Sequence, residues 1–231
     1  MKNKFFLHLA SFVLAICIIL TTLVVAIESE SSNLKFYHDF QVENKITEVT
    51  GKTQDQLDII SKDLANYLFS GQASLLEKHF NDREIKHMVD VYGLFDLASK
   101  VMTATLTIGA LILLASMFFK AFRPLLKLTA IYIIGLLVLT GLFALLVSSD
   151  FNKYFIKFHE LFFDNDLWLL DPRTDLMIQM LPENFFSTMA FNIAKTFAMI
   201  LIGILGIIGL NELMYKKGLK KCDTCNITEA E

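Results

Sequence analysis

Two histidines carry the clearest chemical potential in this sequence of 231 residues. Glu84, His87 and Asp90 are spaced by three, so on a helix they share one face. Either carboxylate could then orient the imidazole of His87 and raise its basicity. His159 lies in a second polar segment, far along the chain. Because histidine is the side chain best suited to proton transfer near neutral pH, the pair indicates acid–base chemistry.

The segment around His159 mixes aromatic rings closely with polar side chains. An aromatic belt at a membrane surface would explain the rings but not the polar residues among them. An apolar aromatic pocket with a few convergent polar groups is what a lipid-handling site requires. Besides His87 and His159 as catalytic residues, the supporting candidates are Glu84, Asp90, Phe158, Asn165, Asp166, Trp168 and Asp171.

A zinc site is the competing chemistry, since two histidines with acidic neighbours can bind the metal. Glu84, Asp90 and Asp166 would be the acidic ligands, but no pair shows the usual close ligand spacing. We therefore expect no metal and no other cofactor. A non-catalytic alternative, in which both histidines are solvated or structural residues, also stays open.

Four long apolar runs must position these residues. They are Phe5–Ile27, Val101–Phe119, Leu128–Val147 and Met189–Leu210. Each has about 19–23 residues, which as a helix matches the roughly 30 Å hydrocarbon core of a bilayer. The runs hold almost no ionisable groups, which argues against a transporter or channel. The sequence thus predicts a mainly α integral membrane protein with four transmembrane helices.

The basic residues predict the orientation. Lys2 and Lys4 precede the first run, Lys120, Arg123 and Lys127 lie between the second and third, and further lysines follow the fourth. Positive charge marks the cytoplasmic side, so both chain termini are expected there. The expected segments are an N-terminal tail and first span (1–27), an extracellular segment (28–92), the second span (93–119), a cytoplasmic hinge (120–127), the third span (128–148), an extracellular aromatic segment (149–187), the fourth span (188–211) and a cytoplasmic tail (212–231).

The two extracellular segments are expected to form a small mixed cap. Leu34–Phe40 alternates in part, as a strand would, and Gln54–Ser70 has apolar residues at helical spacing. The first apolar run also resembles a signal peptide, but its length favours an uncleaved anchor. Cys222 and Cys225 form a lone CxxC in the tail, a weak zinc signal to which we assign no role.

Two stretches resemble the lipoprotein intramolecular transacylase family, Lit, of Gram-positive bacteria. Residues 84–91, EIKHMVDV, are similar to its ExxHMxDV signature before the second span. Residues 158–168, FHELFFDNDLW, with Leu170-Asp171-Pro172 and LPENFF at 181–186, are similar to its second signature. The four-span layout is similar over nearly the whole chain, whereas residues 30–75 are only loosely similar.

This resemblance implies an extracellular cap over four helices and two catalytic histidines, which fall on His87 and His159. It also implies the reaction: the sn-2 acyl chain of a diacylglyceryl lipoprotein moves to the free amine of its own N-terminal cysteine. The partners are then the lipoprotein substrate and membrane lipid, with no nucleic acid. The residues alone decide neither which histidine is the base nor the oligomeric state. Two other functions stay open: an acyltransferase that uses phospholipid, and a non-enzymatic membrane assembly factor.

Overall fold

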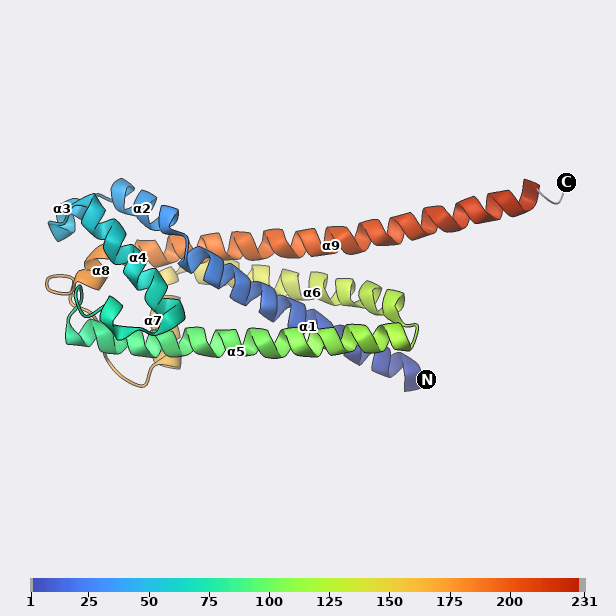
Figure 1. Cartoon of the computed structure of the whole chain (residues 1–231), viewed down its shortest axis with the longest axis horizontal. Coiled ribbons are helices and arrows are strands. Elements are labelled where there is room, and N and C mark those ends of the chain that lie inside the picture. The colour runs from blue at the N-terminus through green and yellow to red at the C-terminus, as the bar shows by residue number, and fades with distance from the viewer. Residues whose placement is uncertain (1, 229–231) are drawn as a thin grey trace.

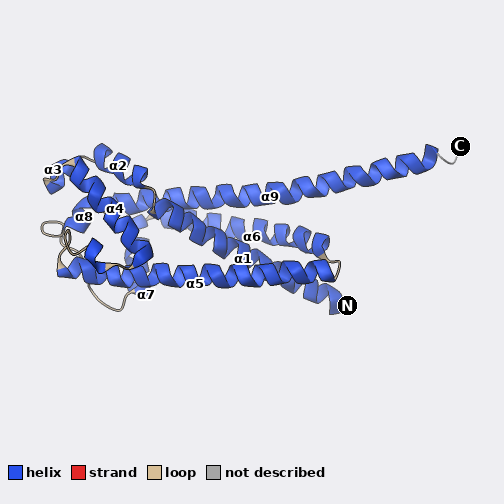
Figure 2. Cartoon of the chain, in the orientation of Figure 1, coloured by secondary structure: helices blue, strands red, loops and turns tan. Residues whose placement is uncertain are grey.

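The computed structural model describes the backbone of residues 2–228 and the side chains of residues 4–216. Within that part of the chain the regular elements are all helices, and no strand is present (Figure 2). Four helices are long and apolar enough to cross a membrane, as the apolar runs predicted. They are α1 (Lys2–Ser31), α5 (Asp82–Phe118), α6 (Phe122–Ser149) and α9 (Glu183–Thr228).

Helix α1 crosses the other three long helices obliquely and packs against each of them (Figure 1). Small and apolar side chains allow this close approach, with Ala15 of α1 buried against Ile133 of α6 and Leu201 of α9. The hydroxyls of Thr21 and Thr105 join α1 to α5 at 2.8 Å. Helix α1 is therefore the central element around which the bundle is assembled.

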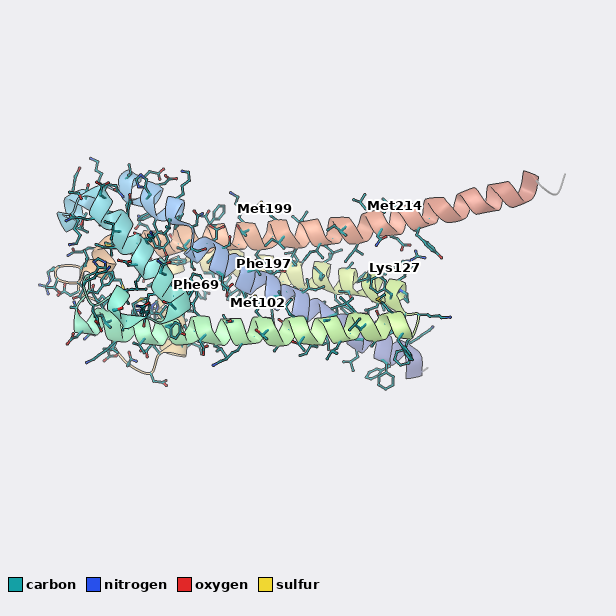
Figure 3. The ribbon with its side chains drawn as sticks, in the orientation of Figure 1. Phe69, Met102, Lys127, Phe197, Met199 and Met214 are labelled. Carbon is teal, nitrogen blue, oxygen red and sulfur yellow. The ribbon has the colours of Figure 1, made fainter. Side chains whose placement is uncertain are left out.

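The outward faces of the long helices are covered with apolar side chains. Met199 and Met214 project outward from α9, whereas Phe197 is turned into the bundle (Figure 3). In water such a surface would be an aggregation hazard, but in a bilayer it is the expected contact with acyl chains. The apolar surface and the lengths of the helices thus both indicate a bundle that spans a membrane.

Six short helices form a cap at one end of the bundle (Figure 1). They are α2 (Leu34–Glu43), α3 (Ile46–Thr50), α4 (Gln54–Ser70), the 3₁₀ helix η1 (Ala73–Leu75), α7 (Phe151–Phe162) and α8 (Leu176–Met180). Its apolar core includes Tyr37, Leu57, Tyr67 and Phe185. Phe185 is at the start of α9, so the fourth span and the cap share this core.

The strand expected at Leu34–Phe40 is wrong, because this segment is part of helix α2. Asn33 caps that helix by accepting from the amide of Phe36, and Tyr37, Phe40 and Gln41 form its buried face at helical spacing. A mixed cap is therefore not shown. The helix expected at Gln54–Ser70 is confirmed as α4, which begins with a capping box between Thr53 and Gln56.

Two long helices extend past their apolar runs toward the cap. Helix α5 begins at Asp82, so His87 lies on its second turn. Helix α9 begins at Glu183, at the end of the second candidate segment. At the other end of the molecule, the side chains of Cys222 and Cys225 lie outside the described residues.

Candidate active site

The first turn of α5 is fixed by a capping box. The side chain of Asn81 accepts hydrogen bonds from the amides of Arg83 and Glu84, at 2.9 and 3.1 Å. Glu84 in turn accepts from the amide of Asn81, at 2.8 Å. These bonds satisfy amides that would otherwise lack partners at the helix start, and they hold the turn that precedes His87.

Glu84 also joins α5 to the segment before α9. Its side chain is only 1% exposed, and its second oxygen accepts from the amide of Met177 in α8 at 2.6 Å. Both carboxylate oxygens are thus bound to backbone amides. Glu84 is thus a buried link between α5 and α8, and it is not a hydrogen-bond partner of His87.

The two candidate histidines come from different elements and lie next to each other. The ring centroids of His87 on α5 and His159 on α7 are 6.1 Å apart, and each side chain is 8% exposed. Phe163 lies against both rings, at 5.3 Å from His87 and 5.5 Å from His159. The structure therefore brings together two imidazoles that are far apart in the sequence.

The contacts of His159 determine its tautomer. Its Nδ1 is 2.7 Å from the carbonyl oxygen of Phe155, one turn earlier on α7. A carbonyl can only accept, so Nδ1 carries the hydrogen and Nε2 keeps a free lone pair. Burial lowers the pKa of His159 below its ordinary value, and the bond to Phe155 offsets part of that change.

Aromatic rings enclose His159. The ring of Trp168 is 4.8 Å from it, that of Phe155 is 4.4 Å away and that of Phe158 is 5.5 Å away. Phe158 is itself 45% exposed, and the adjacent Leu161 is 75% exposed. A buried imidazole is thus separated from the apolar surface of α7 by little more than one ring.

The segment after α7 is attached to α5 near His87. The side-chain amide of Asn165 donates to the carboxylate of Asp90 at 2.8 Å. The guanidinium of Arg83 donates to the main-chain carbonyl of Asp166, whose own side chain is exposed. The structure therefore joins two of the supporting candidates, Asp90 and Asn165, while Asp166 contributes a contact through its backbone.

No hydrogen bond links His87 to Glu84 or Asp90 among the described side chains, and the buried Nδ1 of His87 has no partner. The sequence-based idea that a carboxylate orients this imidazole thus finds no contact to support it. The unpaired nitrogen leaves His87 free to bind a polar group of a substrate.

Asp171 and Asp175 lie in the turn that precedes α8. The carboxylate of Asp171 pairs with Arg173 at 2.7 Å, and this hydrogen-bonded pair lowers the pKa of Asp171 to about 2. Asp175 is buried and accepts from the side-chain amide of Asn81 at 2.9 Å and from the amide of Asp171 at 2.7 Å.

Sequence reasoning missed Asn81 and Asp175 as parts of the site. Each stands just before a helix, which is the usual place for a capping residue. That signal marks a helix start but does not reveal that the two side chains bind each other across the site.

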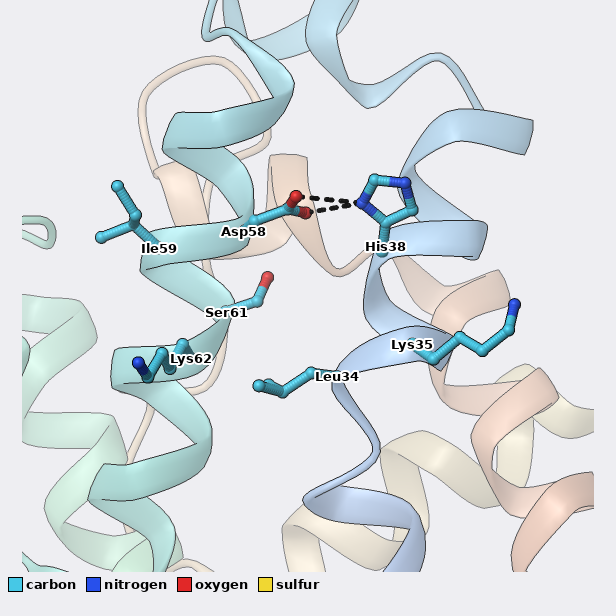
Figure 4. A pocket seen from close by; sticks show the side chains of 7 residues that line it. All are labelled: Leu34, Lys35, His38, Asp58, Ile59, Ser61 and Lys62. Carbon is cyan, nitrogen blue, oxygen red and sulfur yellow. Dashed lines mark hydrogen bonds and ion pairs between the residues drawn. The ribbon is translucent and has the colours of Figure 1, made fainter.

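No group of three His, Cys, Asp or Glu side chains within residues 4–216 is arranged to hold a metal ion. Two surface hollows lie away from the histidine pair. One, of about 370 Å³, lies between α2 and α4, where His38 Nδ1 is 3.0 Å from both oxygens of Asp58 (Figure 4). The other, of about 430 Å³, lies along α5 and is lined by Ser99, Lys100, Thr103, Ala104, Thr107 and Ile108.

The comparisons with known proteins give the family. The family described as lipoprotein intramolecular transacylase Lit matches residues 12–186. None of the curated proteins compared with the chain matches it.

Solved structures of the membrane integral lipoprotein intramolecular transacylase Lit from Bacillus cereus have the same fold. One is 25% identical, with a TM-score of 0.74, and the alignment covers 96% of this chain and 99% of that one. A variant of the same protein with one histidine replaced by alanine is 23% identical, with a TM-score of 0.78 and coverage of 94% and 98%. A third structure carries arginine at a mutated histidine, at 23% identity and a TM-score of 0.74, with coverage of 93% and 98%.

The family match extends over most of the chain and includes both histidine segments, and the four long apolar helices agree with an integral membrane protein. The chain therefore belongs to the Lit family of lipoprotein intramolecular transacylases and is a membrane-integral transacylase.

Proposed function

We propose that the protein moves the sn-2 acyl chain of a diacylglyceryl-cysteine to the α-amine of the same cysteine, giving a lyso-form lipoprotein. The observation that carries this proposal is the buried pair of His87 and His159, whose rings are 6.1 Å apart on two separate elements. Acyl transfer from an ester to an amine needs a base for the amine and a proton for the departing oxygen. Two adjacent imidazoles give the site one group for these proton transfers and a second group for the reacting carbonyl.

His159 is the base in this proposal. An α-amine has a pKa near 7.7–8.0, so at neutral pH it is largely protonated and must lose a proton before it attacks. The Nε2 of His159 has a free lone pair because Nδ1 donates to the carbonyl of Phe155. The Phe155 carbonyl also stabilises the imidazolium that forms when Nε2 accepts the proton.

His87 is the group that binds the reacting carbonyl. Its imidazole lies beside His159, and the unpartnered Nδ1 can donate to the ester oxygen as negative charge develops there. The new bond joins the amine nitrogen to the acyl carbon, and the bond from that carbon to the glyceryl oxygen breaks. His159 passes the first proton from the amine to the glyceryl oxygen and then accepts a second proton from the amine nitrogen as the amide forms. The second proton leaves to solvent, so each transfer releases one proton. The transfer needs no covalent acyl-enzyme.

The aromatic surroundings suit a lipid substrate. Attack through a medium-sized ring costs chain entropy, which a confined apolar pocket offsets by fixing the shape of the substrate. The exposed face of α7, with Phe158 and Leu161, follows directly after the third span and offers a path for acyl chains from the bilayer. No second substrate is required.

We further infer that this site is on the extracellular face of the cell membrane. The support is the charge pattern, since the basic residues Lys120, Arg123 and Lys127 lie at the end of the bundle away from the cap. The positive-inside rule places that end in the cytoplasm. Lipoproteins with a free N-terminal cysteine would then meet the site from outside.

The experiment is to incubate the purified protein with a synthetic diacylglyceryl lipopeptide and locate the acyl chains by tandem mass spectrometry. We expect one chain on the peptide amine and one on the glyceryl group, without any added lipid. An unchanged lipopeptide under varied detergent and lipid conditions would contradict the proposal. Transfer that depends on added phospholipid would instead support an acyltransferase with a phospholipid donor.

A further inference from the structure

Asp90 is a carboxylate beside the histidine pair that has a hydrogen-bond donor but no counter-ion. It lies one helical turn after His87 on α5 and is part-buried. Its Oδ2 accepts from the side-chain amide of Asn165 at 2.8 Å. Among the described side chains, none of the ion pairs includes Asp90. Asp171, by contrast, is paired with Arg173.

The residue that holds Asp90 lies in the chain segment that supplies two aromatic rings to the site. Asn165 lies in the chain between Phe163, whose ring is 5.3 Å from that of His87, and Trp168, whose ring is 4.8 Å from that of His159. The face of an aromatic ring attracts cations, and ammonium ions bind to such faces. A carboxylate that has no counter-ion and is held by this aromatic segment is therefore suited to an ammonium ligand.

The contacts of His87 exclude the simplest other role for Asp90. A carboxylate that orients an imidazole must accept from one of its nitrogens. Nδ1 of His87 has no hydrogen-bond partner, and the hydrogen bond of Asp90 goes to Asn165. Asp90 is thus free to bind a group that is not part of the protein.

We propose that Asp90, held by Asn165, is the subsite for the ammonium group of the substrate's N-terminal cysteine. This subsite selects lipopeptides that have a free α-amine over those that lack one. It rests on the proposed function, because Asp90 lies one turn after His87 and the amine would be bound next to the histidine pair. Acylation of the amine removes the positive charge, so the product loses this contact and is released.

The test uses two lipopeptides that cannot react because alkyl ethers replace their acyl esters. One has the free N-terminal amine, and the other is the des-amino form, with hydrogen in place of that amine. Dissociation constants are measured by titration calorimetry at pH 6.5, where the amine is charged. We expect the wild-type protein to bind the amine form about tenfold more tightly, as for a charge-assisted hydrogen bond near a surface.

The variant Asp90→Asn should bind the two forms about equally, with the affinity for the des-amino form unchanged. Asp164→Asn is the matched control, because it removes a charge from the exposed segment beside Asn165, and it should keep the preference. In the wild-type protein the preference should disappear at about pH 9.5, where the amine is neutral. This last measurement needs no variant and so does not depend on the folding of Asp90→Asn.

A preference for the amine form that survives in Asp90→Asn or at high pH would overturn the proposal. Equal loss of both ligands in Asp90→Asn would also overturn it, since a structural role predicts that result. The ether lipopeptides bind without reacting, so the outcome is independent of acyl transfer. If they behave as expected while the ester lipopeptide stays unchanged, the proposed function fails and the ammonium subsite stands.

Discussion

At the scale of single residues, His159 and His87 differ in one contact, on which the roles proposed for them depend. The Nδ1 of His159 donates to the carbonyl of Phe155, whereas the Nδ1 of His87 has no partner. The first arrangement fixes a tautomer with a free basic nitrogen, and the second leaves a nitrogen for the substrate. Residue types and spacing predicted the pair, but they could not separate the two roles, because the Phe155 carbonyl is a feature of the backbone.

The lowered pKa of His159 predicts how the site responds to acid. An exposed histidine becomes protonated when the pH falls below its ordinary pKa of about 6.5. Burial lowers the pKa of His159, so this side chain stays neutral to a lower pH. The kcat/KM for the lipopeptide should therefore fall on the acidic side with an apparent pKa below 6.5. Protonation can be followed separately through Trp168, the single tryptophan of the chain, whose ring lies 4.8 Å from His159 and should lose fluorescence beside an imidazolium.

The control for this titration is His159→Gln, which should remove the fluorescence change between pH 7 and pH 4 while Trp168 stays in place. A midpoint at or above 6.5 in the wild-type protein would contradict the account, because it would mean that burial does not control this histidine. The same midpoint in His159→Gln would show that another group causes the change.

At the scale of elements, a set of side chains from the first turns of α5 holds the segment between α7 and α9. Glu84 binds the amide of Met177, Asn81 binds Asp175, and Asp90 binds Asn165. Residues of this segment that lie near the histidines, such as Trp168, depend on these attachments. Polar contacts between α5 and this segment therefore help to hold the ring of Trp168 beside His159.

Replacing Glu84 by glutamine should destabilise the protein and reduce activity together. Both Glu84 oxygens accept from amides, and the glutamine NH₂ cannot accept, so one buried amide loses its partner. The expected cost is about 1–3 kcal/mol, which a thermal unfolding assay in detergent detects as a lower Tm. Glu77→Gln, at an exposed cap position, is the control and should leave Tm unchanged. An unaltered Tm in Glu84→Gln would show that the hydrogen bonds of Glu84 contribute nothing to stability.

The cap shows which elements the sequence could predict. Helix α4 was predicted with its bounds, because its apolar residues recur at helical spacing over several turns. Leu34–Phe40 was misread as a strand. Over so few residues, a partial alternation of apolar residues fits both a strand and a helix. The helix is favoured because it packs Tyr37 and Phe40 together against Phe185.

At the scale of the whole molecule, the four spans were predictable and their arrangement was not. Hydrocarbon excludes polar groups, so the spans stand out as long apolar runs. Because the runs are apolar on all sides, their sequence does not show which faces of the helices pack together. Nothing in the runs indicates that α1 packs against the other three helices. A polar cluster away from the cap, where Glu212 of α9 pairs with Arg123 and Lys127 of α6, also joins residues that are far apart in the sequence.

The proposed orientation in the membrane predicts which cysteines can be labelled in intact cells. Cys222 and Cys225 should react with a membrane-impermeant maleimide only after the cells are opened. In a variant that lacks both, Lys62→Cys in the cap should react in intact cells, because Lys62 is exposed beside α2. Reaction of the tail cysteines in intact cells, with protection of Lys62→Cys, would reverse the orientation.

The most direct measurement of the central claim is the rate of acyl migration in four proteins: wild type, His87→Ala, His159→Ala and the double variant. Each histidine is expected to contribute about 10²–10⁴ in rate. The double variant should be hardly slower than the slower of the two single variants, because the base and the carbonyl-binding group act together in one transition state. Thermal unfolding of each variant establishes that it is folded. If folded His87→Ala or His159→Ala moved the acyl chain at the wild-type rate, the histidine pair would not be the catalytic centre.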